Sequence, residues 1–169
     1  MLNVKSLSIC LSLALVSACT NGNPFDNPDE FVDLNANSQF DGFDAVGDPT
    51  SASYFAQAVG DKVLFAVDQS TLSEGAKTVL IKQAQWLNAN AGYAIIVEGH
   101  ADEQGTREYN LALGARRANA VQQFLISQGV DSTRLKTVSY GKERPVELCS
   151  TESCYSQNRR SVTRLTGLG

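Results

Sequence analysis

The chain of 169 residues contains a single histidine and no Gly-x-Ser-x-Gly segment. Without such a segment, His100 has no evident nucleophile that it could serve as a general base. His100 and Asp102 alone also make a poor metal site, because zinc in proteins needs three or four protein ligands. The sequence shows no pair of carboxylates suited to hold a catalytic water. We therefore predict that the protein is not an enzyme and has no metal, and that His100 is a structural, hydrogen-bonded side chain.

The sequence also lacks a strong excess of positive charge. Its net charge is −4, and the charges are unevenly distributed. Eight acids and no Lys or Arg lie between Thr20 and Asp61, whereas thirteen Lys and Arg and ten acids lie between Lys62 and Gly169. A surplus of three positive charges is too small for the basic face that nucleic-acid binding needs. We predict an acidic segment joined to a mildly basic domain, with no nucleic-acid partner but with a charge compatible with a partner that carries carboxylates.

Long hydrophobic runs are missing as well. The apolar run Leu7–Val16 would extend for roughly 15 Å as a helix, about half of the ~30 Å that a bilayer core requires. Together with Lys5 and the small residues before Cys19, this run predicts a signal peptide over residues 1–18. The segment Leu15–Cys19 resembles the bacterial lipobox, in which the cysteine receives a diacylglyceryl group and, after cleavage, an N-acyl chain. A plain secretory signal in which Cys19 is incidental is the alternative.

The residue after the cysteine bears on the membrane in which the protein resides. Thr20 stands where an Asp would resemble the inner-membrane retention signal of enteric bacteria. We therefore expect the outer membrane, with the lipid on Cys19 as the anchor and the domain in the periplasm. Several acyl chains on one cysteine bind a membrane far more strongly than one, because each buried CH₂ contributes ~0.8 kcal/mol.

Residues 19–53 are rich in Asn, Asp, Gly, Ser and Pro, and their four phenylalanines follow no helical or strand period. We predict a flexible, mostly disordered tether here and a folded domain over residues 54–169. In the domain, Ser73 and Thr106 are candidate caps of two helices, the second of which ends at Gly129. Four strands are predicted: Lys62–Val67 from its alternating apolar residues, Tyr93–Glu98 from its β-branched residues between two glycines, and further Leu135–Tyr140 and Ser161–Leu165. This order predicts an α/β fold (βαβαβ-β) with two main helices on one face of a four-stranded mixed sheet.

Polar side chains follow the ends of the first two strands. Asp68 and Asp102 come after these strands, which a βαβ connection would make parallel, so both should lie at the same sheet edge. Asn110, Leu113 and Arg117 are spaced to share one face of the following helix. A guanidinium and a carboxylate can together hold an amino-acid zwitterion. Alternatively, Arg117 pairs with Asp102 or Asp68 inside the protein.

Several motifs resemble a known family. They are Glu98–Thr106, Tyr109-Asn110, Leu113-Gly114, Arg116–Ala118, Val138–Pro145 and Asn158–Arg160. In this order they are similar to the outer-membrane-protein-A C-terminal (OmpA-like) domain family, in particular to its branch of peptidoglycan-associated lipoproteins. The resemblance covers about residues 61–166. It implies an OmpA-like fold and non-covalent binding of diaminopimelate in uncrosslinked stem peptides of peptidoglycan.

The resemblance also implies roles for individual residues. Asp102 would take the ammonium of the ligand and Arg117 its carboxylate, Asn110 and Leu113 would line the pocket, and Val67 and Asp68 would close its other side. Arg159 would support the site from the last strand. Family members usually have an aromatic residue at the position of Val67, which makes that wall thinner here. Gln104 replaces a common Arg, a change that could alter a protein partner.

Two cysteines remain in the domain once Cys10 leaves with the signal peptide and Cys19 carries lipid. Cys149 and Cys154 are expected to form a structural disulfide in an exported protein. A metal site or a redox pair is the alternative, although a Cys-x-x-x-x-Cys segment without a nearby histidine is weak for both.

Several functions remain in competition at this point. The leading hypothesis is an outer-membrane lipoprotein that tethers its membrane to peptidoglycan. By resemblance, it would exchange between peptidoglycan and the periplasmic protein TolB, as part of a Tol-Pal system of envelope and cell division. The wall-binding domain of a flagellar-type stator would need an uncleaved transmembrane helix, which the signal around Cys19 contradicts. The other two hypotheses are a peptidoglycan hydrolase and a purely structural envelope lipoprotein.

Overall fold

The computed structural model describes residues 47–168. The predicted signal peptide, the lipidated Cys19 and most of the predicted tether lie outside these residues. The described elements, in chain order, are α1 (Ala52–Tyr54), the π-helical segment η1 (Phe55–Gly60), β1 (Lys62–Leu64), α2 (Glu74–Ala89), β2 (Tyr93–His100), α3 (Arg107–Ser127), the 3₁₀ turn η2 (Ser132–Arg134), β3 (Leu135–Gly141), α4 (Glu152–Asn158) and β4 (Arg160–Leu168). None of the described helices is long and apolar enough to cross a bilayer.

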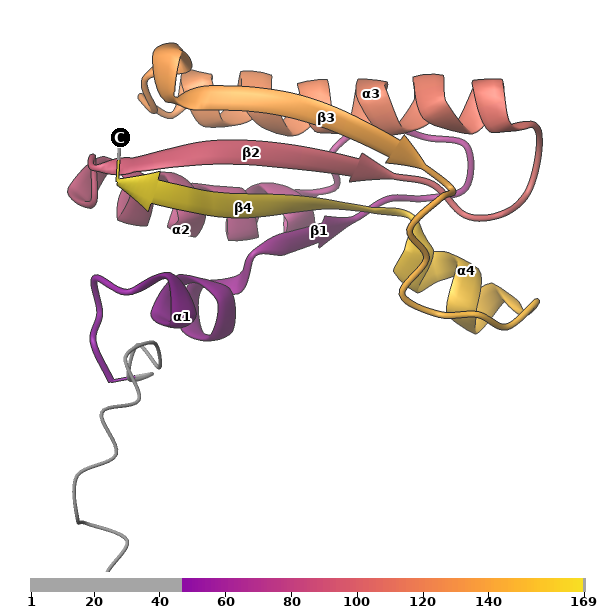
Figure 1. Ribbon diagram of the computed structural model, residues 1–169, viewed down its shortest axis with the longest axis horizontal. Coiled ribbons are helices and arrows are strands. Elements are labelled where there is room, and N and C mark those ends of the chain that lie inside the picture. The colour runs from indigo at the N-terminus through magenta and orange to yellow at the C-terminus, as the bar shows by residue number, and fades with distance from the viewer. Residues whose placement is uncertain (1–46, 169) are drawn as a thin grey trace, which may run out of the picture. The chain divides into compact units, whose positions relative to one another are not determined.

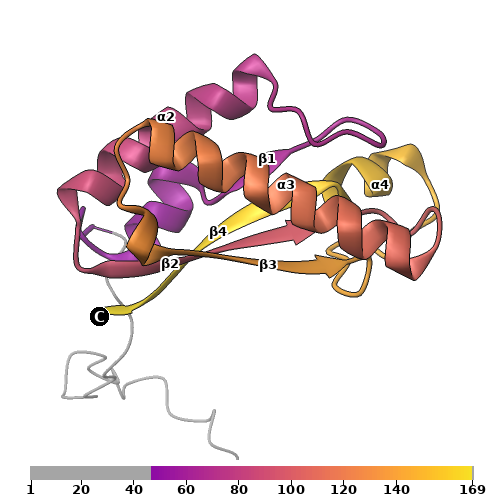
Figure 2. The ribbon, with the colours of Figure 1, turned by 90° about the horizontal axis from the view of Figure 1, so that it is seen from above.

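The four strands form one mixed sheet in the order β1-β4-β2-β3. β4 runs antiparallel to both of its neighbours, and β2 and β3 are parallel. β1 and β2 therefore point the same way although β4 separates them, so their carboxyl ends face the same end of the sheet. Figures 1 and 2 show α2 and α3 side by side over one face of this sheet. The predicted fold class is confirmed.

The two long helices begin where the sequence predicts. The hydroxyl of Ser73 accepts a hydrogen bond from the backbone N–H of Ala76, and that of Thr106 accepts one from Tyr109. Each hydroxyl satisfies one of the helix's otherwise unpaired N–H groups. Between helices and sheet lies a core whose buried members include Leu80, Leu87, Ile95, Val97, Val121 and Leu125. This core holds α3 along β2 and β3.

The closest approach between a helix and the sheet is made by two glycines. A Cβ added to Gly99 would lie 1.8 Å from the carbonyl oxygen of Gly114, and one added to Gly114 would lie 2.4 Å from the hydroxyl of Ser139. Only hydrogen atoms fit in these gaps, so α3 contacts β2 backbone to backbone here. This contact brings the first turns of α3 close to the carboxyl end of β2, where the predicted site residues lie.

The structure departs from the predicted elements at the two ends of the domain. β1 stops at Leu64, three residues before the predicted Val67, because the chain bends away from β4 after Phe65. The helical residues 52–60 and the helix α4 were not predicted, since both are shorter than the window of roughly 11–18 residues in which helical periodicity can be recognised. Figure 1 shows α4 at the end of the sheet where β4 begins.

The ordered domain also begins upstream of the predicted boundary at residue 54. The indole N–H of Trp86 donates to the carbonyl oxygen of Pro49 at 2.7 Å, and the hydroxyl of Tyr93 donates to that of Thr50 at 3.0 Å. Ser51 is buried and caps α1, and Phe55 packs against Trp86 with ring centroids 4.9 Å apart. These contacts explain how a polar segment without periodicity is held on the domain.

A disulfide and the hydrogen bonds of one side chain join α4 to the loop that precedes it. A disulfide joins Cys149 to Cys154, with 5.8 Å between their Cα atoms. The side chain of Asn158, at the end of α4, accepts hydrogen bonds from the backbone N–H groups of Val146 and Glu147 and donates one to the carbonyl oxygen of Glu147. The short helix is therefore fixed to the preceding loop at both ends.

Replacing Gly99 with Ala should abolish or severely weaken folding. The added methyl group would overlap the backbone of α3, so we expect the free energy of unfolding to fall by more than about 3 kcal/mol. Urea unfolding followed by circular dichroism measures the change. Gly167→Ala is the matched control, because its methyl group would meet nothing within 4 Å. Equal unfolding midpoints for the two variants would contradict the contact.

Removing the disulfide should cost stability without changing the fold. The double variant Cys149→Ser/Cys154→Ser should lose about 2 kcal/mol in free energy of unfolding, the value that the chain-entropy model gives for so short a loop. Thermal unfolding of the wild type with and without dithiothreitol provides the companion measurement. A wild type that is insensitive to the reductant would show that the two thiols are not bonded in the protein.

Candidate binding site

A pocket of about 230 Å³ opens at the carboxyl ends of β1 and β2, beside the first turns of α3. Five residues predicted from the sequence line it together, namely Val67, Asp68, Asp102, Asn110 and Leu113. They come from three separate segments, which the parallel directions of β1 and β2 and the packing of α3 bring to one place. The structure thus places these five predicted residues around a single cavity.

The carboxylate of Asp102 is the most buried acid of the pocket, with 7 % of the residue exposed. Its Oδ2 accepts a hydrogen bond from Nη1 of Arg159 at 3.1 Å. Arg159 is itself buried and also donates to the carbonyl oxygen of Phe65 and to the carboxylate of Glu152. Arg159 does not line the pocket, so its contact with the site is through Asp102. Glu152 raises the pKa of the Arg159 guanidinium, and Asp102 adds to this effect.

Arg117 is fully buried and lies behind the pocket lining. Its Nε, Nη1 and Nη2 donate to the carbonyl oxygens of Gln69, His100 and Ala66 at 2.8, 2.8 and 3.1 Å. Among the described residues it makes no ion pair with Asp102 or Asp68, so the predicted internal ion pair is absent there. A guanidinium has five N–H donors, and these three carbonyls leave two of them for a further acceptor.

The charge of Arg117 is nevertheless influenced by the nearby acids. Burial lowers the pKa of Arg117 to about 10, while the charges of Asp102 and Asp68 oppose that shift. Arg117 therefore remains protonated at neutral pH. A buried guanidinium without a carboxylate in direct contact is costly, and an anionic ligand would relieve that cost.

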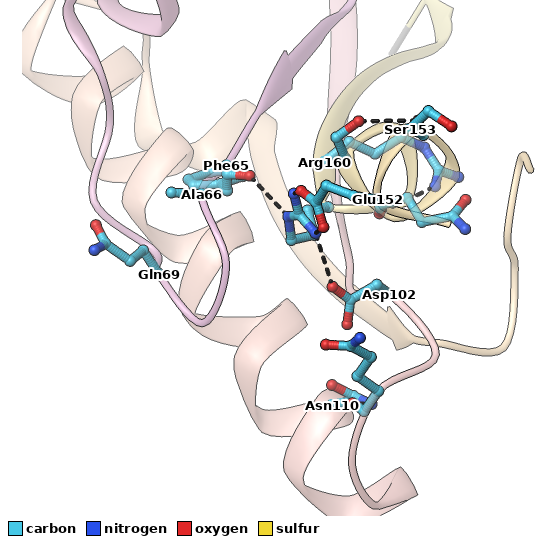
Figure 3. Close-up of polar contacts among 12 residues, drawn as sticks. Phe65, Ala66, Gln69, Asp102, Asn110, Glu152, Ser153 and Arg160 are labelled. Carbon is cyan, nitrogen blue, oxygen red and sulfur yellow. Dashed lines mark hydrogen bonds and ion pairs between the residues drawn. The ribbon is translucent and has the colours of Figure 1, made fainter. Parts of the chain in front are cut away.

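Asn110 contributes an acceptor that has no partner. Its Nδ2 donates to the carbonyl oxygen of Gln104 at 2.8 Å, but its buried Oδ1 has no hydrogen-bond partner within residues 47–168. Lys142 holds the carbonyl oxygens of the two flanking residues, Glu103 and Gly105. The loop over the pocket is therefore fixed at three successive carbonyls, and Asn110 presents a free amide oxygen beside Asp102 (Figure 3).

Asp68 and Tyr109 form the exposed side of the pocket. Asp68 has a φ of 56°, a left-handed conformation that is uncommon for residues other than glycine. The hydroxyl of Tyr109 donates to its carboxylate. Tyr109, Gln104 and Gly105 line the pocket but were not predicted as site residues. For Tyr109 the sequence held a signal, because a large aromatic side chain directly precedes Asn110 at the start of the helix.

His100 differs from the prediction in one respect. It is buried, but neither ring nitrogen has a hydrogen-bond partner in the described part of the chain. The ring instead packs on Tyr140 with centroids 5.5 Å apart, and its Nε2 lies 3.6 Å from Oε2 of Glu98. Burial and, to a smaller extent, the charges of Arg160, Arg144 and Arg164 together lower the pKa of His100 to about 4. The ring is therefore neutral at pH 7 and is held by packing rather than by the expected hydrogen bonds.

The donors and acceptors of this site suit a small zwitterion. Carboxylate and amide oxygens on one side can accept hydrogen bonds from an ammonium group, and a guanidinium behind them can donate to a carboxylate. The described residues contain no group of three or more His, Cys, Asp or Glu side chains that could hold a metal ion.

Comparisons with known proteins agree on one family. The model of the OmpA family matches residues 64–159. A peptidoglycan-associated lipoprotein of Mesorhizobium japonicum is 61% identical over 121 residues, which are 72% of this chain and 72% of that protein. The lipoprotein of the same name from Haemophilus influenzae is 36% identical over 165 residues, covering 94% of this chain and 95% of its own.

Solved structures give the same result for the fold. The crystal structure of the peptidoglycan-associated lipoprotein from Burkholderia pseudomallei is 36% identical in sequence, with a TM-score of 0.64, and the match covers 72% of this chain and 98% of that one. The C-terminal domain of Helicobacter pylori MotB is 21% identical with a TM-score of 0.59, covering 63% of this chain and 84% of its own. The second likeness concerns the fold alone.

The buried histidine predicts a loss of stability in acid. The unfolded chain takes up a proton at His100 near pH 6.5, whereas the folded protein does so only near pH 4. The stability that the neutral His100 contributes is therefore fully present above pH 6.5. It is lost as the pH falls from 6.5 to 4, by up to about 3 kcal/mol in free energy of unfolding. Urea unfolding at several pH values measures it. His100→Phe keeps a ring against Tyr140 but cannot titrate, so its stability should fall less steeply; parallel pH profiles would contradict the assignment.

Proposed function

We propose, starting from the fact that this chain belongs to the OmpA family, that it is an envelope lipoprotein that binds peptidoglycan non-covalently through the pocket beside Asp102. The single observation that carries the proposal is the set of polar groups at this pocket. Two carboxylates and an unpartnered amide oxygen line it, and a buried guanidinium with donors to spare lies behind it. The names of the relatives support the choice of ligand, because they describe proteins associated with peptidoglycan.

The ligand we propose is the diaminopimelate of an uncrosslinked stem peptide. Its free end carries an ammonium and a carboxylate on one carbon, which matches the division of the site into acceptors and donors. The ammonium would lie between Asp102 and Asn110, while Asp68 would accept from it at the exposed side. Leu113 and Val67 would contact the methylene chain. A pocket of about 230 Å³ has room for such a side-chain end but not for a sugar chain.

The carboxylate of the ligand would bind Arg117. Arg117 is fully buried, and it holds the carbonyl oxygens of Ala66 and Gln69. Residues 66–69 must therefore shift for the ligand to reach it. They form a loop between β1 and α2 rather than part of the sheet, so a local displacement leaves the core intact. Binding in this way uses hydrogen bonds and ion pairs alone, and we propose no catalytic step.

The remaining assignments concern the cell. We propose that lipid on Cys19 anchors the protein in the outer membrane, so that the domain ties that membrane to the wall. A periplasmic TolB-like protein in a Tol-Pal system that serves cell division is the proposed partner. Support for these points comes from the lipobox-like segment and from relatives that are named lipoproteins.

The binding proposal predicts that two single substitutions weaken wall binding. A chain starting at Thr20 would be sedimented with isolated sacculi containing diaminopimelate, as wild type, Asp102→Asn and Arg117→Lys. Asp102→Asn removes the negative charge that would hold the ammonium, and Arg117→Lys removes the planar fork that would hold the carboxylate, so we expect at least a tenfold loss of affinity from each, or about 1.4 kcal/mol. The neighbouring exposed residues provide matched controls, Glu103→Gln and Arg116→Lys, which should bind as the wild type does. Equal sedimentation of all five proteins would refute the site.

A further inference from the structure

The guanidinium of Arg159 is shared between two carboxylates that come from different parts of the chain. Glu152, in the first turn of α4, takes both of its terminal nitrogens, with Oε2 3.3 Å from Nη1 and Oε1 bonded to Nη2. Asp102, after β2, takes only Nη1, through Oδ2 at 3.1 Å. Nε is occupied by the carbonyl oxygen of Phe65 at 3.2 Å. Glu152 thus occupies the forked edge of Arg159 and leaves Asp102 a single hydrogen bond.

This division determines what Asp102 can offer to a ligand. A planar guanidinium prefers a bidentate partner, and a bidentate pair uses both oxygens of a carboxylate. With Glu152 in that position, the Oδ1 of Asp102 is not bonded to Arg159, and Asp102 lines the pocket. Without Glu152, Asp102 is the only carboxylate of residues 47–168 in contact with this guanidinium.

We propose that Glu152 is a positioning residue of the pocket, which holds Arg159 so that Asp102 keeps one oxygen and its negative charge for an ammonium ligand. The inference rests on the proposed function and adds a residue that contacts neither the pocket nor the ligand. Glu152 acts through Arg159, because it is absent from the pocket lining and bonds the same guanidinium as Asp102.

Charge favours the same arrangement. Asp102, Glu152 and Arg159 together carry one net negative charge, which an ammonium neutralises. Loss of the carboxylate at Glu152 would leave Asp102 and Arg159 as a neutral pair, and the attraction for a cation would fall. Arg159 is only 4% exposed, so its charge is poorly screened by water even though the side chain of Glu152 is 67% exposed. An ordinary surface ion pair would have a smaller effect.

The covalent structure around α4 holds Glu152 in place. α4 has seven residues, too few for a stable helix by itself. The disulfide joins Cys149 to Cys154, so it encloses Glu152 in its loop. Asn158 fixes the other end of the helix to the backbone of Val146 and Glu147. The carboxylate of Glu152 therefore faces Arg159 from a rigid support rather than from a free loop.

A double-mutant cycle on the full-length protein tests the inference. Affinity for the stem tripeptide L-Ala-γ-D-Glu-meso-diaminopimelate would be measured by calorimetry for the wild type, Glu152→Gln, Asp102→Asn and the double variant. We expect Glu152→Gln to weaken binding about fivefold in the wild-type background and to have no further effect in the Asp102→Asn background. Glu147→Gln removes the same charge from a nearby exposed position and should bind as the wild type does.

Three results would overturn the inference. Wild-type affinity in Glu152→Gln would show that Arg159 needs no help from Glu152. An equal loss in both backgrounds would show that Glu152 acts independently of Asp102, as a merely structural residue would. Absence of binding by the wild type would overturn the proposed function and this inference with it. Ligand concentrations up to the millimolar range keep the weaker variants measurable, and thermal unfolding confirms that each variant is folded.

Discussion

The burial of the Arg117 guanidinium is the constraint on which the rest of the site depends. Its three hydrogen bonds end on carbonyl oxygens of the loop after β1 and of the last residue of β2, while its own backbone belongs to α3. One side chain thus ties together the three segments that form the pocket. Because the buried carbonyl oxygen of His100 is one of these acceptors, α3 cannot slide along the sheet without breaking hydrogen bonds. The backbone contact between Gly99 and Gly114 also fixes the position of α3 along the sheet.

Around this constraint the charged groups form two connected sets. Arg117 lies behind the pocket with donors to spare, and Arg159 lies beside it with its donors shared between Asp102 and Glu152. Asp102 therefore faces the pocket on one side and a guanidinium on the other. The pocket is prepared for a molecule that carries both signs of charge, since a pure cation would leave Arg117 uncompensated and a pure anion would meet Asp102 and Asp68. This balance is the physical basis for proposing an amino-acid end as the ligand.

Much of the fold could be predicted from the sequence, because its main elements follow simple periods. Ser73 and Thr106 indicated the helix starts, alternation indicated the first strand, and β-branched residues between two glycines indicated the second. The ends of the domain could not be predicted in the same way. Pro49 and Thr50, upstream of position 54, are held by the indole N–H of Trp86 and the hydroxyl of Tyr93, which are distant in sequence. α4 is held by a disulfide and by the side chain of Asn158, so its stability comes from bonds to the preceding loop rather than from helix propensity.

The site shows a similar limit. Asp68, Asp102, Asn110 and Leu113 could be placed together because strand direction and helical spacing determine where they lie. Their bonds could not be predicted, since periodicity does not show that Arg117 holds three carbonyls or that Glu152 competes for Arg159. His100 illustrates the same point, because only the structure shows its ring nitrogens unpartnered and its ring packed on Tyr140.

The central claim is that the pocket beside Asp102 receives an amino-acid zwitterion, and nuclear magnetic resonance tests it most directly. The isotopically labelled protein would be titrated with the diaminopimelate stem tripeptide while side-chain and backbone signals are followed. The account predicts that the largest chemical-shift changes occur at the Asn110 amide, at Tyr109 and at Nε of Arg117. The signals of residues 66–69 should also change, because the ligand displaces their loop. Shifts confined to the face of the sheet opposite α2 and α3, with the Arg117 signal unmoved, would contradict it.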